Sequence, residues 1–181
     1  MRIWLGSWRV NDYLARMVNR AKWETRAWLA EDAIRADALT SCLRTSSDAL
    51  SVWTCDGTED GWTDVVLALM TVPEKDTIDT IDVVLVWRAT LESDGFQLVQ
   101  SAGKTNVEDL KSRHADVVHL DAQGLMRLAQ RLATSIADGK LYRRFRRADI
   151  KTILNQAIRS QRLSSSQLHE KIAEQLDVSR W

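Results

Sequence analysis

The stretch IDVVLVWRAT, residues 81–90, holds an almost continuous run of apolar side chains, most of them β-branched or aromatic. Apolar residues at successive positions are typical of a strand that is covered on both faces of its sheet. A sheet covered on both faces needs helices packed on either side. The stretch therefore predicts a strand of an α/β fold at residues 81–90.

Three further strands are expected around this one. LSVWTC, at 50–55, is rich in β-formers and bounded by turn residues. The sequence SDG at 93–95 predicts a turn, after which FQLVQS at 96–101 should return antiparallel. VVHL, at 117–120, completes the set. Together these segments predict a small mixed sheet of about four strands with flanking helices, and right-handed crossovers wherever strands run parallel.

Helical patterns separate the expected strands. GWTDVVLALM, at 61–70, has its apolar residues at helical spacing, and the acids before it suit the positive end of a helix dipole. A short helix is expected around 107–111. Asp121 should cap a longer helix, and Gly139 should end it as the residue after the C-cap.

The first 44 residues are expected to form a helical arm. Asn11 or Asp12 can cap a helix that runs to the mid-thirties, and 36–43 looks helical as well. The first apolar residues follow the spacing i, i+3, i+4 and i+7: Leu14, Met17, Val18 and Ala21.

The C-terminal region predicts two helices after an extended piece. One helix running through 141–161 would turn three arginines toward the core, which is costly, so a break is expected near Arg147. LYRRFRR, at 141–147, is then extended. Helices at 148–161 and 165–176 follow, the second with a Ser164–Gln167 capping box.

Length and composition predict one globular domain. The chain has 181 residues, of which 45% are hydrophobic, and contains seven glycines and one proline. We expect a helical arm at 1–44, an α/β core at 45–138 and C-terminal helices at 139–181. Two cysteines suggest no disulfide framework, and no run approaches the ~18 apolar residues of a membrane span. A cytoplasmic protein without a membrane segment is expected.

Charge is segregated along the chain although the formal net charge is zero. Residues 1–50 carry eight basic and six acidic side chains, 51–125 carry five and fourteen, and 126–181 carry twelve and five. The net charges are thus +2, −9 and +7. The basic end can dock on the acidic middle of the same chain, dock on a second copy, or attract another partner.

Familiar catalytic motifs match poorly. AGKT, at 102–105, follows a strand as a phosphate-binding loop would, but Leu98 stands where that loop needs its first glycine. Two histidines and two acids between 114 and 121 could ligate a metal, yet they have no established metal spacing, and Asp121 is wanted as a cap. We predict no catalytic residues, metal or cofactor, which favours a protein that is not an enzyme.

Interface-type residues are, in contrast, plentiful. The chain has eight tryptophans, and the first 28 residues include Trp4 and Trp8 with a net charge of +4. Tryptophan and arginine are enriched at interface hot spots and also grip single-stranded nucleic acid. The predicted binding residues are Trp4, Trp8, Tyr142, Arg143, Arg144, Arg146 and Arg147.

These observations favour a non-enzymatic intracellular interaction protein, such as an accessory subunit or an immunity-type binder, with a protein partner or a second copy of itself. The first alternative is nucleic-acid binding through the four arginines at 143–147. The charge of the expected helix at 165–176 argues against reading DNA, because it has one lysine, Lys171, against Glu170, Glu174 and the following Asp177. The second alternative is a metal- or nucleotide-dependent enzyme built around 103–121.

Overall fold

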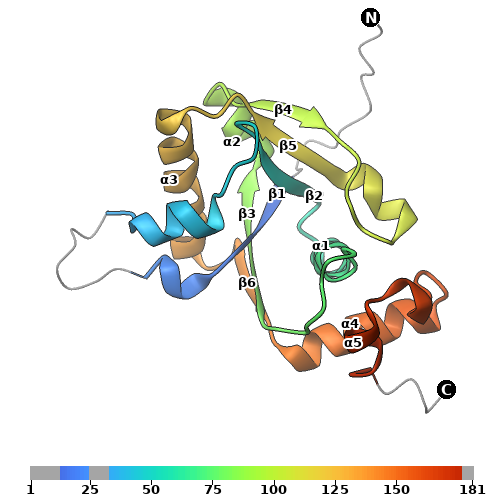
Figure 1. Cartoon of the computed structure of the whole chain (residues 1–181). Helices are drawn as coiled ribbons and strands as arrows, with labels where there is room; N and C mark the ends of the chain where they lie inside the picture. The colour runs from blue at the N-terminus through green and yellow to red at the C-terminus, as the bar shows by residue number, and fades with distance from the viewer. Residues whose placement is uncertain (1–12, 25–32, 177–181) are drawn as a thin grey trace, which may run out of the picture.

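The computed structural model describes residues 13–24 and 33–176, which form a six-stranded sheet with flanking helices (Figure 1). The strand order is β4-β5-β2-β1-β3-β6, and every neighbouring pair is antiparallel. The strands are β1 (Tyr13–Val18), β2 (Leu50–Cys55), β3 (Ile81–Trp87), β4 (Gln97–Gln100), β5 (His114–Val118) and β6 (Tyr142–Phe145). The α/β class is confirmed, but the sheet has six antiparallel strands where about four mixed ones were expected.

The predicted N-terminal helix is wrong for residues 13–18, which form the strand β1. Tyr13 pairs with Cys55 of β2 and with Trp87 of β3, so β1 lies inside the sheet. Leu14 and Val18 are both buried against one face. A separation of four residues puts two side chains on one side of either a helix or a strand, so the apolar pattern could not decide between them. The described remainder of the expected arm contains η1 (Arg20–Lys22, a 3-10 helix) and η2 (Ala38–Cys42, a π-helix). The parts of the expected arm at 1–12 and 25–32 lie outside the described residues.

The expected antiparallel return after residues 81–90 is also wrong. Residues Arg88–Ser93 form a short helix, α2, instead of extending β3. β4 then pairs with β5, with Val99 opposite Asp116, and does not pair with β3. β5 itself begins three residues earlier than predicted, after the 3-10 helix η3 (Glu108–Arg113).

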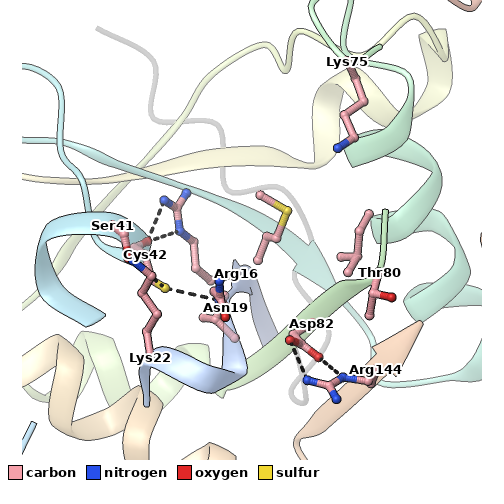
Figure 2. A pocket seen from close by; sticks show the side chains of 12 residues that line it. Arg16, Asn19, Lys22, Ser41, Cys42, Lys75, Thr80, Asp82 and Arg144 are labelled. Carbon is pink, nitrogen blue, oxygen red and sulfur yellow. Dashed lines mark hydrogen bonds and ion pairs between the residues drawn. The ribbon is translucent and has the colours of Figure 1, made fainter. Parts of the chain in front are cut away.

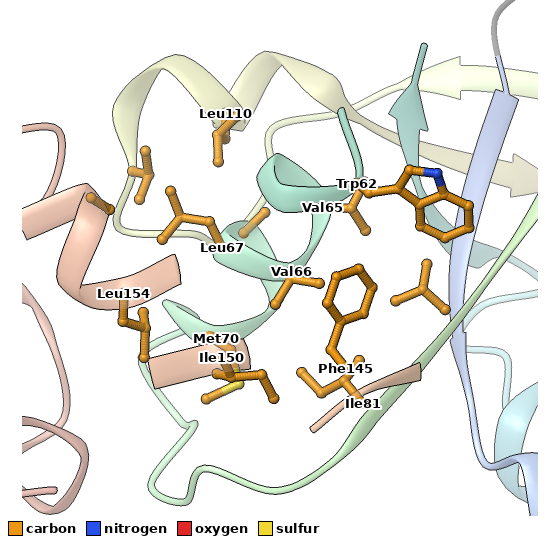
Figure 3. Packing of buried hydrophobic residues seen from close by; sticks show 14 of the residues in the cluster. Trp62, Val65, Val66, Leu67, Met70, Ile81, Leu110, Phe145, Ile150 and Leu154 are labelled. Atoms are coloured by element: carbon orange, nitrogen blue, oxygen red, sulfur yellow. The ribbon is translucent and has the colours of Figure 1, made fainter. Parts of the chain in front are cut away.

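One face of the sheet is covered by α1 (Glu59–Met70), as the sequence predicted. The Thr58 hydroxyl caps this helix by accepting a hydrogen bond from Gly61 N at 3.1 Å. Figure 3 shows that the α1 side chains meet residues from β6 and α4 (Arg147–Arg159). The labelled members of this core are Trp62, Val65, Val66, Leu67, Met70, Ile81, Leu110, Phe145, Ile150 and Leu154.

The opposite face is covered by α3 (Ala122–Asp138) (Figure 1). Its predicted caps are confirmed: the Asp121 carboxylate accepts a hydrogen bond from Gly124 N at 2.6 Å, and Gly139 ends the helix with φ 73°. Leu128 and Leu132 pack against Val84 and Val86 of β3. β3 is thus buried on both faces, which explains its continuous apolar sequence.

The C-terminal region is extended and then helical, as expected. The chain turns from β6 into α4 at Arg146, one residue before the predicted break. The Ser164–Gln167 capping box is confirmed, but the expected helix at 165–176 is two short pieces, η4 (Ser165–Gln167) and α5 (Glu170–Ala173). Leu168 and His169 separate them, and the buried side chain of Leu168 packs into the α1 core from an extended backbone. No helix in the described ranges is both long and apolar enough to cross a membrane.

Candidate functional site

The predicted arginine cluster lies where β6 turns into α4, at one edge of the sheet. Phe145 is buried in the α1 core and fixes β6, while the arginine side chains reach the surface. Asp149 accepts a hydrogen bond from Arg146 N at 2.8 Å and so starts α4. An edge strand with charged side chains resists pairing with other chains.

Three of the four arginines form ion pairs with acids of their own chain. Arg143 Nη1 lies 2.6 Å from Glu59, Arg144 Nε lies 2.7 Å from Asp82, and Arg147 Nη2 lies 3.1 Å from Asp79. The guanidinium of Arg146 has no carboxylate within ion-pair distance in the described part of the chain. The cluster is therefore exposed but largely neutralised.

Asp82 is the centre of the most buried of these pairs. This carboxylate accepts hydrogen bonds from the Tyr142 hydroxyl at 2.7 Å and from Arg20 N at 3.1 Å, besides those from Arg144. Burial opposes ionisation of Asp82, but the hydrogen bonds outweigh it and lower the pKa of the carboxyl. Burial and the neighbouring carboxylate raise the pKa of Tyr142 to about 12. Tyr142 thus serves the fold at this site.

The same pattern extends over the whole C-terminal third. Of eleven ion pairs among the described residues, seven join a basic side chain of 126–181 to an acid of 51–125, so the segregated charge is mostly satisfied within the molecule. Besides the three above, these are Arg131–Asp94, Arg162–Asp64, Arg162–Asp109 and Lys171–Asp76. Docking of the basic end on the acidic middle of the same chain, one of the expected outcomes, is confirmed.

The tryptophans divide into several groups. Trp4 and Trp8, the two predicted as binding residues, lie outside the described residues. Trp53 and Trp62 are buried in the α1 core. Trp87 is 38% exposed, and its ring contacts that of Tyr13 in a tilted arrangement, with ring centroids 4.1 Å apart.

The AGKT segment packs into the fold and does not form a loop around an anion. Gly103 is buried, and a Cβ added to it would lie 2.4 Å from the Trp53 ring, so close packing explains the glycine. Gly103 N donates to Lys111 O at 3.0 Å, and Asn106 N donates to Thr71 O at 2.9 Å. These amides are engaged inside the protein.

The polar residues at 114–121 also separate. His114 and Asp116 share a face of β5, whereas His119 is exposed with φ 58° and Asp121 caps α3. Within the part of the chain that the structure describes, no three histidine, cysteine or acidic side chains are grouped to hold a metal.

A serine joins His114 to Asp116. Ser101 Oγ lies 2.7 Å from His114 Nδ1 and 2.6 Å from Asp116 Oδ2. Because an ionised carboxylate only accepts, Ser101 donates to Asp116 and accepts from His114. Nucleophilic catalysis needs the opposite arrangement, with histidine accepting the serine proton. The network therefore ties the end of β4 to β5.

Sequence reasoning missed a hollow of about 570 Å³ beside Asp82, called the cationic hollow below (Figure 2). It lies between β1, η2 and the segment that enters β3, and its basic side chains are Arg16, Lys22, Lys75 and Arg144. Arg16 comes from the strand that was expected to be a helix, so its position facing this space could not be foreseen. No signal in the sequence indicated it, because the spacing of Leu14 and Val18 fits a helix as well as a strand.

A second feature was missed at the opposite edge of the sheet. β4 is the terminal strand there, and its side chains carry no charge. Gln97, Val99 and Gln100 are exposed, Val99 by 50%. The sequence predicted that β4 pairs with β3, so its actual place as the terminal strand beside β5 was not expected.

Comparisons with protein-family models, with curated proteins and with solved structures found no match to this chain.

Proposed function

We propose that the protein is a non-enzymatic interaction protein that binds an extended segment of a partner protein along the outer edge of β4. The observation that carries this proposal is an exposed edge strand without charged side chains, on a molecule whose C-terminal cations are mostly paired internally. Extended peptides commonly add to such an edge through main-chain hydrogen bonds.

The backbone groups that face outward can be assigned from the register. Ser101 N donates to His114 O at 3.3 Å, so these two residues form a hydrogen-bonded antiparallel pair. Hydrogen-bonded pairs recur at every second residue of an antiparallel ladder, so Val99 and Asp116 form the next such pair. The N–H and C=O groups of Val99 therefore point toward β5. The N–H and C=O groups of Leu98 and Gln100 therefore point away from the sheet. No described residue outside the sheet bonds to them.

A strand that pairs with these two residues gains about four main-chain hydrogen bonds. Val99, on the sheet face beside the edge, offers apolar surface to its side chains. The interface is small, and it suits a reversible contact better than a permanent one.

The nucleic-acid alternative has less support. Phosphates would have to compete with Glu59, Asp82 and Asp79 for three of the four arginines. Only Arg146 offers an unpaired guanidinium in this cluster, judged among the described residues. The affinity of a nucleic-acid site grows with the number of phosphates that its cations contact, so a single free arginine would give weak binding.

The test uses two variants of one exposed residue. Gln100→Pro removes an outward N–H without removing a hydrogen bond to β5, whereas Gln100→Ala keeps the N–H and removes only the side chain. Proteins retained from nuclease-treated extract of the native host would be quantified by mass spectrometry. We expect a specific partner to be lost at least tenfold with the proline variant and retained within about twofold with the alanine variant.

Amide hydrogen exchange then locates the contact. In the complex, the amides of Leu98 and Gln100 should become protected, because they gain acceptors from the partner. A partner that binds the proline variant equally well, or leaves these amides unprotected, contradicts the proposal. Retention of nucleic acid from an extract that has not been treated with nuclease would instead support the alternative, if it depends on Arg143 and Arg146.

A further inference from the structure

We propose that the cationic hollow binds the phosphate group of a small organic phosphomonoester. The hollow has four basic side chains and one acid, Asp82, which is already paired with Arg144. Arg16, Lys22 and Lys75 remain. This inference rests on different residues from those of the β4 edge and does not depend on the proposed function.

Arg16 carries a half-buried positive charge that no described carboxylate neutralises. Its Nε and Nη2 donate to Cys42 O at 3.1 and 2.9 Å, and its Nη1 donates to Ser51 O at 2.8 Å. Burial lowers the pKa of this guanidinium. The carbonyl groups fix its orientation but carry no net charge. A cation taken out of water in this way is stabilised by an anion.

The two lysines add charge from different elements. Lys22 comes from η1 and Lys75 from the segment after α1, and Figure 2 shows them on opposite sides of the hollow with Arg16 between. Neither lysine forms an ion pair with a described residue. Asp79 acts on Lys75 at longer range, but that carboxylate is already paired with Arg147.

Charge and shape together favour phosphate over carboxylate. Three cations that approach from different directions match an anion with several oxygens and a charge near −2, whereas a carboxylate carries a single charge and is planar. Two of the five N–H groups of Arg16 are not used by the carbonyls and can bind oxygens.

The size of the hollow favours an ester over free phosphate. A space of about 570 Å³ is within the range of sites for small organic ligands and much larger than one phosphate group. Met17, Val18 and Ile81 provide apolar wall beside the cations. An organic group attached to the phosphate can pack there.

The test compares inorganic phosphate with phenyl phosphate, each titrated into the full chain at constant ionic strength. Binding would be followed by ¹H–¹⁵N NMR, including the Arg16 side-chain Nε–H. We expect saturable shifts confined to the hollow and at least tenfold tighter binding of phenyl phosphate. Equal affinity for the two probes would contradict the ester, and shifts that do not saturate would contradict the site.

A matched pair of double variants controls for charge. Lys22→Gln with Lys75→Gln should weaken phenyl phosphate binding at least tenfold. Lys140→Gln with Lys151→Gln removes the same charge away from the hollow and should change it less than twofold. Equal weakening by both pairs would show nonspecific attraction and overturn the proposal. Gln100→Pro should leave phosphate binding unchanged, which separates this inference from the proposed function.

Discussion

The two edges of the sheet differ in how their side chains are used. β6, at one edge, carries arginines that pair with acids far away in the sequence, and Phe145 anchors it in the core. β4, at the other edge, has no charged side chain and is largely exposed. A basic run resembles a binding motif in the sequence, yet here it mainly stabilises its own molecule. The strand whose backbone hydrogen-bonding groups remain unused is β4, which has no charged side chain.

Phe145→Ala should give the largest effect, because it removes the ring that anchors β6. Phe145 is 4% exposed, and its ring lies 6.3 Å from that of Trp62. Truncating a buried phenylalanine costs about 3–5 kcal/mol of unfolding free energy, which urea denaturation followed by circular dichroism would measure. Val99→Ala on β4 is the matched change and should cost less than about 1 kcal/mol. Equal losses would mean that both edges are anchored alike.

Asp82→Asn should have an intermediate effect, about 1.5–3 kcal/mol at pH 7, because it weakens charge-assisted hydrogen bonds from Arg144 and Tyr142. The folded-state pKa of Asp82 lies below its ordinary value of 3.8, so the carboxylate stabilises the fold at neutral pH and loses this contribution as pH falls through the folded pKa.

Urea denaturation at several pH values checks the sign of this linkage. The difference between Asp82→Asn and the unmodified chain should be full above about pH 5 and shrink below about pH 4. Asp79→Asn, at the exposed partner of Arg147, is the control and should change stability little. A difference for Asp82→Asn that grows at low pH would contradict the assignment.

Arg147→Ala should have the smallest effect, about 0–1 kcal/mol, because both members of its ion pair are more than half exposed. Thermal unfolding at low ionic strength should show any difference in stability between Arg147→Ala and the unmodified chain. The same measurement in about 0.5 M salt should remove this difference, because the Debye length there is well below the roughly 10 Å that it has at about 0.1 M. If Arg147→Ala lowered the free energy of unfolding as much as Asp82→Asn is expected to, the exposure of an ion pair would not determine its contribution to stability.

Local signals predicted the parts of the fold that local chemistry determines. The helix at 61–70, the Asp121 cap, the Gly139 stop and the turn from an extended piece into a helix near Arg147 all depend on neighbouring residues. β1 was mistaken for a helix because its strand character depends on pairing with β2 and β3, which the sequence does not display. The pairing of β4 was wrong for the same reason.

The candidate site was predicted less well than the fold. Charge counts indicated that the basic end could meet the acidic middle, but which arginine meets which acid depends on the path of the chain: Arg143 and Glu59 are 84 residues apart. The cationic hollow combines side chains from separate elements, so only the folded arrangement reveals it. Trp4 and Trp8 remain predictions.

The core under α1 has a consequence for how the chain is made. α1 is synthesised early, but its apolar side chains pack against Ile150 and Leu154, which leave the ribosome about eighty residues later. Until then the nascent chain exposes this apolar helix, together with a sheet that still lacks β6. Truncation before residue 150 would therefore leave the apolar surface of α1 exposed and prone to aggregation, and productive folding must wait until residues 150–154 have been synthesised.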